Sequence, residues 1–156
     1  VIDLRDNPGG LVDVCIRLAD SLLPEGVITY TEDRKGEKNY YTSDPAATEI
    51  PYVVLVNGGS ASASEIVAGA IKSTGVGKIV GTTTYGKGII QEIVQLDSGD
   101  ATKLTVMQYF SPDGNVIHEK GVEPDYVVEI TEEDFTDGVL ERENDKQLQK
   151  ALELLK

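Results

Sequence analysis

The chain has 156 residues, of which 40% are hydrophobic and 26% charged, a composition that excludes a wholly disordered chain and suits one domain with its own core. A formal net charge of −13 disfavours nucleic acids and anionic membrane surfaces as partners. The single cysteine, Cys15, excludes an intrachain disulfide and a metal site built from several cysteines.

The first part of the chain alternates short strands with a helix. Residues 1–4 predict a buried strand, and the Asn-Pro-Gly-Gly turn after it leads into a helix that ends before Pro24. Cys15 occupies an apolar position of this helix, which predicts a buried thiol. Residues 27–31 and 38–42 are rich in β-formers and flank a polar turn, so they predict a hairpin.

The middle of the chain repeats this alternation. A continuous apolar run at residues 52–56 predicts a buried strand, and residues 60–72 predict a helix of small residues. Its inner side is expected to carry Ile66, Val67, Ala70 and Ile71. Residues 78–81 predict another short strand, and two β-rich runs joined by a polar turn predict a second hairpin at 89–96 and 103–110.

The last part of the chain is strongly acidic. Residues 123–156 hold 11 acidic and 4 basic side chains, which is typical of a solvated segment. Its final apolar residues recur at helical spacing, and this helix could pack on the body or on another subunit. We divide the chain into a core at residues 1–130 and an acidic C-terminal extension with a helix at 131–156.

The chain offers few residues for metal or triad chemistry. His118 is the only histidine, so a Ser-His-Asp triad would have to use it, and a lone histidine is more often structural. Catalytic zinc usually takes three protein ligands with histidine or cysteine among them. The strand-to-helix junction at residues 57–60 lacks the Walker pattern and the GxGxxG spacing. We therefore expect no metal ion and no organic cofactor.

Three alternating serines, Ser60, Ser62 and Ser64, stand at this junction. A serine between a strand and a helix exposes its hydroxyl, and neighbouring amides can stabilise an oxyanion. A serine nucleophile needs a base, and without histidine a desolvated lysine can serve. Lys87, which lies between two glycines, is the candidate, and an ordinary surface lysine in a glycine turn is the alternative interpretation.

Five segments in chain order resemble the motifs of the C-terminal processing peptidases, which are also called tail-specific proteases and are S41-type serine peptidases. They are residues 2–10, 54–66, 80–91, 109–114 and 120–125. One such motif has little specificity, whereas five in order over residues 1 to 130 are very specific.

The resemblance implies a mixed α/β fold with the spiral of β-β-α units of the ClpP and crotonase families, followed here by a C-terminal helix. It implies that Ser62, the middle serine, is the nucleophile and that Lys87, 25 positions later, is the general base. Gln91, four residues after the lysine, would hold and orient it. On this basis Ser60 and Ser64 are expected to be structural.

The resemblance also implies where the oxyanion would be held. The donors would be the backbone N–H of Ala63 and an amide of Gly9 or Gly10, in a loop that the fold should bring alongside. Asp3 and Arg5 are expected to form an architectural pair rather than a catalytic one.

The function implied by the resemblance is endopeptidase cleavage of proteins near their C-termini through an acyl-enzyme, outside the cytoplasm of a bacterium. Members of the family carry an upstream PDZ domain that binds substrate tails, so the chain is expected to be a catalytic core that is incomplete at its N-terminus. The alternatives are a catalytically inert fragment, or a binding or oligomerisation module on the same fold. In the last case the acidic C-terminal helix would join copies into a homo-oligomer.

Overall fold

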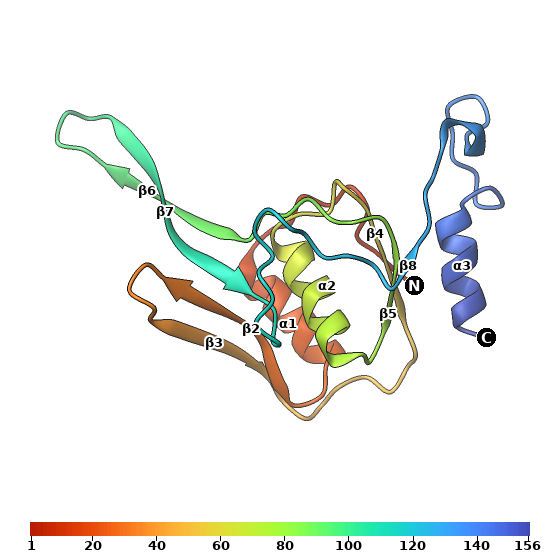
Figure 1. Ribbon diagram of the computed structural model, residues 1–156, viewed down its shortest axis with the longest axis horizontal. Coiled ribbons are helices and arrows are strands. Elements are labelled where there is room, and N and C mark those ends of the chain that lie inside the picture. Colours follow the sequence, from red (N-terminus) through yellow and green to blue (C-terminus); the bar gives the residue numbers. More distant parts are fainter.

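The computed structural model describes residues 1–156 as two sheets with helices between and beside them (Figure 1). The strands are β1 (Ile2–Asp3), β2 (Gly26–Asp33), β3 (Lys38–Ser43), β4 (Val53–Val56), β5 (Lys78–Gly81), β6 (Ile89–Gln95), β7 (Ala101–Phe110) and β8 (Tyr126–Val127). The helices are α1 (Val12–Leu22), α2 (Ala63–Thr74), α3 (Lys146–Leu154) and a 3-10 turn at Glu132–Asp134. None of these helices has the length and hydropathy that a bilayer crossing requires.

The first sheet is parallel, in the order β1-β4-β5-β8. All four residues of β4 are buried, as expected for a strand covered on both faces. Its side chains alternate: Val54 and Val56 belong to the main core with α1 and α2, whereas Val53 and Leu55 belong to a second cluster with α3.

The second sheet is antiparallel, in the order β3-β2-β7-β6. Both expected hairpins are present: β2 pairs with β3, and β6 pairs with β7. The β6–β7 hairpin projects away from the body (Figure 1), and no residue of β6 is buried. This hairpin therefore carries exposed apolar side chains, namely Ile93, Val94, Leu96, Leu104 and Met107.

Helices α1 and α2 lie between the two sheets (Figure 1). The four apolar residues expected on the inner side of α2 are all buried. Cys15 of α1 is buried too, as predicted, and its Sγ lies 3.2 Å from the carbonyl oxygen of Ala63, to which it donates. Burial raises the pKa of the Cys15 thiol to about 12. The two helices are thus joined at the start of α2.

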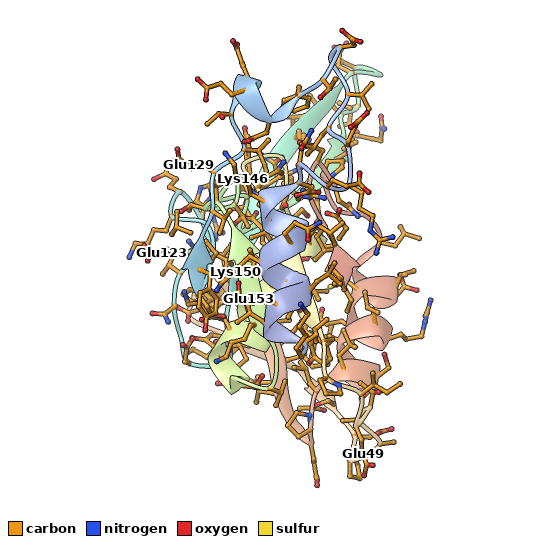
Figure 2. All side chains as sticks on the ribbon, turned by 90° about the vertical axis from the view of Figure 1, so that its right-hand side faces the viewer. Glu49, Glu123, Glu129, Lys146, Lys150 and Glu153 are labelled. Atoms are coloured by element: carbon orange, nitrogen blue, oxygen red, sulfur yellow. The ribbon has the colours of Figure 1, made fainter.

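Helix α3 packs on the outer face of the parallel sheet, which is one of the two positions that its sequence left open. Ala151 is fully buried against this sheet, in the same cluster as Leu55. Figure 2 shows α3 across the front of the molecule. Asp145 caps the helix by accepting from the N–H of Leu148 at 2.9 Å.

Three details differ from the expected elements. Strand β1 is limited to Ile2–Asp3, and neither residue is buried, in contrast to the buried strand expected at residues 1–4. Helix α2 begins at Ala63 rather than at residue 60, because Ser62 has a positive φ of 57° that is incompatible with a helix. Strand β8 was not predicted, since two residues carry no periodicity. It pairs with β5 through Val80 and Gly81 and completes the parallel sheet.

Candidate active site

The nucleophile candidate lies where β4 turns into α2. Ser62 has φ 57° and ψ −115°, a backbone conformation that a non-glycine residue rarely adopts. Strained residues of this kind concentrate at functional sites, and the exposed serine of a strand-to-helix turn is a known example. Ser62 is half-buried and makes no side-chain capping hydrogen bond, so its hydroxyl is available at the surface.

The hydroxyl groups of the two neighbouring serines bind the backbone, which agrees with the structural role expected for them. Ser60 is fully buried, donates to the carbonyl oxygen of Leu4 at 2.6 Å and accepts from the N–H of Asn57 at 3.0 Å. Ser64 is buried and donates to the carbonyl oxygen of Asn7 at 3.1 Å. The bonds to Leu4 and Asn7 join the nucleophile turn to the loop after β1.

The lysine segment follows β5 and returns to the nucleophile turn. The N–H of Tyr85 donates to the carbonyl oxygen of Ser60 at 3.0 Å. A hollow of about 210 Å³ is lined by Ser62, Lys87 and Gln91 together, so the fold brings the three expected residues to one place. Lys87 is exposed in this chain, which differs from the dry surroundings expected for a lysine base.

Gln91 and two polar residues of β7 that were not expected also line the hollow. Gln91 Nε2 donates to Thr105 Oγ1 of the next strand at 3.3 Å, which leaves its carbonyl oxygen free to accept. Lys103 and Tyr109 of β7 also line the hollow. Tyr109 is buried, and burial, with the nearby Tyr41 and Cys15, raises its pKa to about 12. Sequence patterns gave no signal for these two, because strand pairing alone brings them there.

The loop after β1 lies against the nucleophile turn, as the oxyanion prediction requires. A Cβ added to Gly9 would come within 2.8 Å of the Ala63 nitrogen and 2.9 Å of the Ser62 Cβ, so only glycine fits there. The Gly9 N–H already donates to Asn7 Oδ1 at 2.9 Å. The N–H groups of Ala63 and Gly10 have no acceptor within the protein, which makes them the available pair.

A second hollow of about 210 Å³ adjoins these amides. It is mostly apolar, and its lining includes Gly10 and Ala63 together with Leu11, Val14 and Leu18 of the α1 segment. The start of α2 therefore separates a polar hollow with the lysine from an apolar one.

Glu65 is the principal residue of the site that sequence reasoning missed. It is fully buried in the first turn of α2. Its Oε2 accepts from the N–H groups of Ser62 at 2.9 Å and Lys87 at 2.8 Å, and its Oε1 accepts from the Gly86 N–H at 2.6 Å and the Thr84 hydroxyl at 2.5 Å. The Ser-x-x-Glu spacing of a capping box was the available signal.

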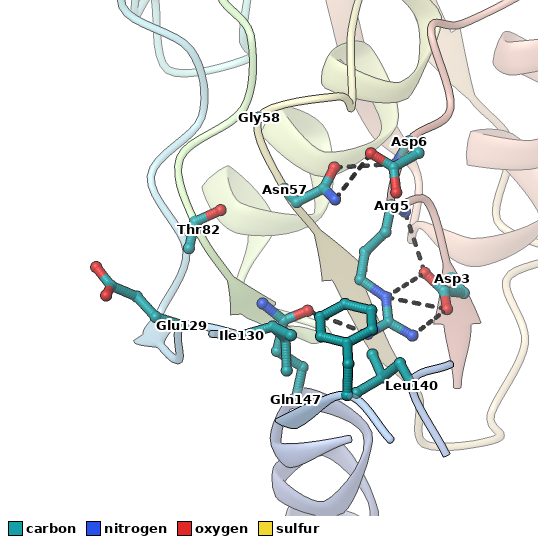
Figure 3. Close-up of a pocket in the computed structure, with 11 residues that line it drawn as sticks. Asp3, Arg5, Asp6, Asn57, Gly58, Thr82, Glu129, Ile130, Leu140 and Gln147 are labelled. Atoms are coloured by element: carbon teal, nitrogen blue, oxygen red, sulfur yellow. Dashed lines mark hydrogen bonds and ion pairs between the residues drawn. The ribbon is translucent and has the colours of Figure 1, made fainter. Parts of the chain in front are cut away.

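The largest cleft of the molecule is elsewhere, beside α3 (Figure 3). Its volume is about 740 Å³ and its lining includes Asp3, Arg5, Asn57 and Gln147. Arg5 pairs with Asp3 at 2.6 Å and with Asp145 at 2.8 Å, which confirms its architectural role and extends it to α3. Burial raises the pKa of Asp3, but the hydrogen bonds and charge of Arg5 outweigh this and leave it lowered.

His118 does not join the hollow with Ser62. It is half-buried, and its Nδ1 lies 3.3 Å from the carbonyl oxygen of Gly86. The histidine thus contacts the backbone next to Lys87, and a Ser-His-Asp triad is not assembled.

Known proteins are similar to this chain in sequence and in fold. Carboxyl-terminal-processing proteases of Synechocystis sp. and Bartonella bacilliformis are each 44% identical, over 99% and 83% of the chain and 36% and 30% of their own lengths. The solved photosystem II D1 C-terminal processing protease is 40% identical, with a TM-score of 0.77 over 81% of the chain and 33% of its own.

These comparisons confirm the expected fold class, since the solved relatives share the mixed α/β arrangement of parallel and antiparallel sheets. Mature CPAF, at 18% identity, has a TM-score of 0.80 over 99% of this chain, a likeness of fold alone. The chain spans about a third of the length of the curated relatives named above. Residues 1–128 match the pattern of peptidase family S41. The chain belongs to peptidase family S41.

Proposed function

We propose that this chain is the catalytic part of a serine endopeptidase that uses Ser62 as nucleophile and Lys87 as general base. The observation that carries the proposal is the shared hollow of Ser62, Lys87 and Gln91 beside a strained strand-to-helix turn. Membership of family S41 supports a peptidase activity.

The first half of the reaction would form an acyl-enzyme. Neutral Lys87 takes the proton of Ser62 Oγ as that oxygen attacks the scissile carbonyl carbon. The negative charge on the carbonyl oxygen is met by the N–H groups of Ala63 and Gly10, which have no acceptor of their own. Protonated Lys87 then gives its proton to the leaving amine, and the peptide bond breaks.

The second half repeats these steps with water. Lys87 takes a proton from a water molecule that attacks the ester of Ser62, and returns it to Ser62 Oγ as the acid product leaves. Gln91 would hold the lysine through its side-chain carbonyl oxygen, while its amide nitrogen is fixed by Thr105.

Lys87 is exposed in this chain, and a bound substrate would shield its side chain from water. A peptide lying over the hollow excludes water and disfavours the charged form of the lysine. The substrates would be proteins cut near their C-termini, as the names of the relatives describe for those enzymes. An upstream PDZ domain that presents the tail is part of the same proposal.

Labelling by a fluorophosphonate, which phosphonylates activated serines as fluoride leaves, tests the assignment. We expect the protein to be labelled, Ser62→Ala to lose labelling completely, and Lys87→Ala to be slowed about 100-fold or more because the base is gone. Mass spectrometry of the digested protein would locate the label on the peptide that contains Ser62.

Ser64→Ala is the matched control, since this serine lies two residues away but its hydroxyl is bound to Asn7. It should keep its labelling rate within a few-fold. Labelling that persists in Ser62→Ala would contradict the proposal. A folded protein that is not labelled at all would favour an inert or binding module instead.

A further inference from the structure

The buried carboxylate of Glu65 has no counter-ion. None of the ion pairs of the chain includes it, and it is fully buried. Burying a charge costs free energy unless hydrogen bonds compensate, and an apolar side chain of similar size would fill the space without that cost. Packing alone therefore does not account for a glutamate at this position.

The four hydrogen bonds of Glu65 join the two segments that carry the proposed dyad. One oxygen, Oε2, accepts from the backbone N–H of Ser62 and from that of Lys87. Because a single atom accepts both bonds, the two nitrogens cannot be farther apart than the two bond lengths together. The other oxygen binds Gly86 and Thr84, on the same segment as the lysine.

Both segments need such a tie. Ser62 is held at a positive φ that an unrestrained serine would leave. Lys87 is exposed between two glycines, of which Gly86 also has a positive φ. Apart from the bonds to Glu65, the backbone bond from Tyr85 to Ser60 is the direct hydrogen bond between the two turns.

We infer that Glu65 is a positioning residue: its carboxylate fixes the backbones of Ser62 and Lys87 relative to each other so that the lysine amine can reach the serine hydroxyl. It acts through these two residues and touches neither substrate nor reacting atoms. The inference rests on the proposed function of Ser62 and Lys87. A misplacement of about 1 Å can cost a reaction about 100-fold in rate, so this tie bears directly on turnover.

Glu65→Gln tests the inference with little change of volume. All four partners donate to the carboxylate, so the amide group of glutamine would face at least one N–H and lose that bond. We expect the maximal rate of phosphonylation by the fluorophosphonate to fall about 10- to 100-fold while the probe concentration at half-maximal rate changes less than about two-fold. An unchanged maximal rate would overturn the inference.

Asp145→Asn is the matched control, because Asp145 is also a buried carboxylate that accepts a backbone N–H at a helix start. It should lower stability without changing the phosphonylation rate, and an equal rate loss in both variants would show that Glu65 is merely structural. Should Glu65→Gln not fold, Thr84→Val removes one of the four bonds instead. We expect it to slow phosphonylation by roughly 3- to 10-fold.

Amide hydrogen exchange separates a failure of this inference from a failure of the proposed function. In Glu65→Gln the amides of Ser62, Gly86 and Lys87 should exchange at least about ten-fold faster, as for lost hydrogen bonds, while Asp145→Asn leaves them unchanged. If the parent protein is not labelled, the proposed function fails, and the positioning role is then tested by amide exchange alone. Unchanged protection of these amides in Glu65→Gln overturns the positioning role.

Discussion

The parallel sheet and the β6–β7 hairpin differ in how they hold the site. The sheet is covered by α1 and α2 on one face and by α3 on the other, and every residue of β4 is buried. The hairpin projects into solvent, and none of the β6 residues is buried. Ser62 follows the buried strand, whereas Gln91 lies on the exposed one.

This difference indicates that the two halves of the site have different rigidity. The nucleophile turn is fixed from several sides, by the loop after β1 and by Glu65. Gln91, the proposed holder of the base, lies on a strand without buried residues, the kind of region that opens locally at low cost in free energy. We therefore expect substitutions in the sheet to unfold the protein and substitutions in the hairpin to be tolerated.

The largest effect is expected for Gly81→Ala, at the end of β5. Gly81 has φ +138°, and an added Cβ would overlap the carbonyl oxygen of Val56 in the neighbouring strand. Neither backbone can move, because Val56 accepts from Thr82 and Gly81 accepts from Val128. We expect a loss of more than about 4 kcal/mol in the free energy of unfolding, measured by urea denaturation.

Gly99→Ala is the matching change at the tip of the hairpin. Gly99 also has a positive φ, +90°, but its added Cβ would meet no atom within 4 Å. Backbone strain alone should cost about 1–2 kcal/mol. Equal losses for the two glycines would contradict the contrast between sheet and hairpin.

An intermediate effect is expected for Leu55→Ala in β4. Leu55 is fully buried between the sheet and α3, so its truncation leaves a cavity and should cost about 2–5 kcal/mol. Ile93→Ala in β6 is the comparison, since Ile93 is 67% exposed and should change stability by less than about 0.5 kcal/mol. Urea denaturation of both variants checks this, and a larger loss at Ile93 would show that the hairpin is packed after all.

Much of this fold could be predicted because each local signal agreed with the tertiary environment. The apolar run at β4 and the small-residue pattern of α2 each identify an element whose burial the structure confirms. The helical spacing also identifies α1, but Leu11, Val14 and Leu18 of that pattern are exposed. Both hairpins followed from their turns. The two-residue β8 could not be predicted, because its pairing with β5 depends on the whole sheet.

The candidate site could be predicted from the family motifs, and only in part from the physical properties of the residues. The motifs pointed to Ser62, Lys87 and Gln91, which line one hollow. Glu65 was missed because an acidic residue in a first helical turn is an ordinary capping residue, and its bonds to Gly86 and Lys87 depend on a segment 21 and 22 positions away. The hydrogen bond from the Gly9 N–H to Asn7 could not be predicted from the sequence either, since it depends on the orientation of the Asn7 side chain.

The smallest effect concerns the segment that leads into α3 on the outer face of the sheet. Lys146 pairs with Asp134 at 2.6 Å, and its hydrogen bond and charge, together with a bond from Thr131, lower the pKa of Asp134. A lowered pKa in the folded state stabilises the protein above the usual aspartate value of about 3.9, and this stabilisation is lost as the pH falls further. Lys146→Ala should therefore lower the urea midpoint at pH 6 by roughly a few tenths of a molar and by less at pH 3. Lys150→Ala is the control variant. It removes a positive charge from the same helix, but Lys150 pairs with the exposed Glu153 and not with Asp134. An equal pH dependence in both lysine variants would show that the Asp134 pair does not stabilise the link between the 3-10 turn and α3.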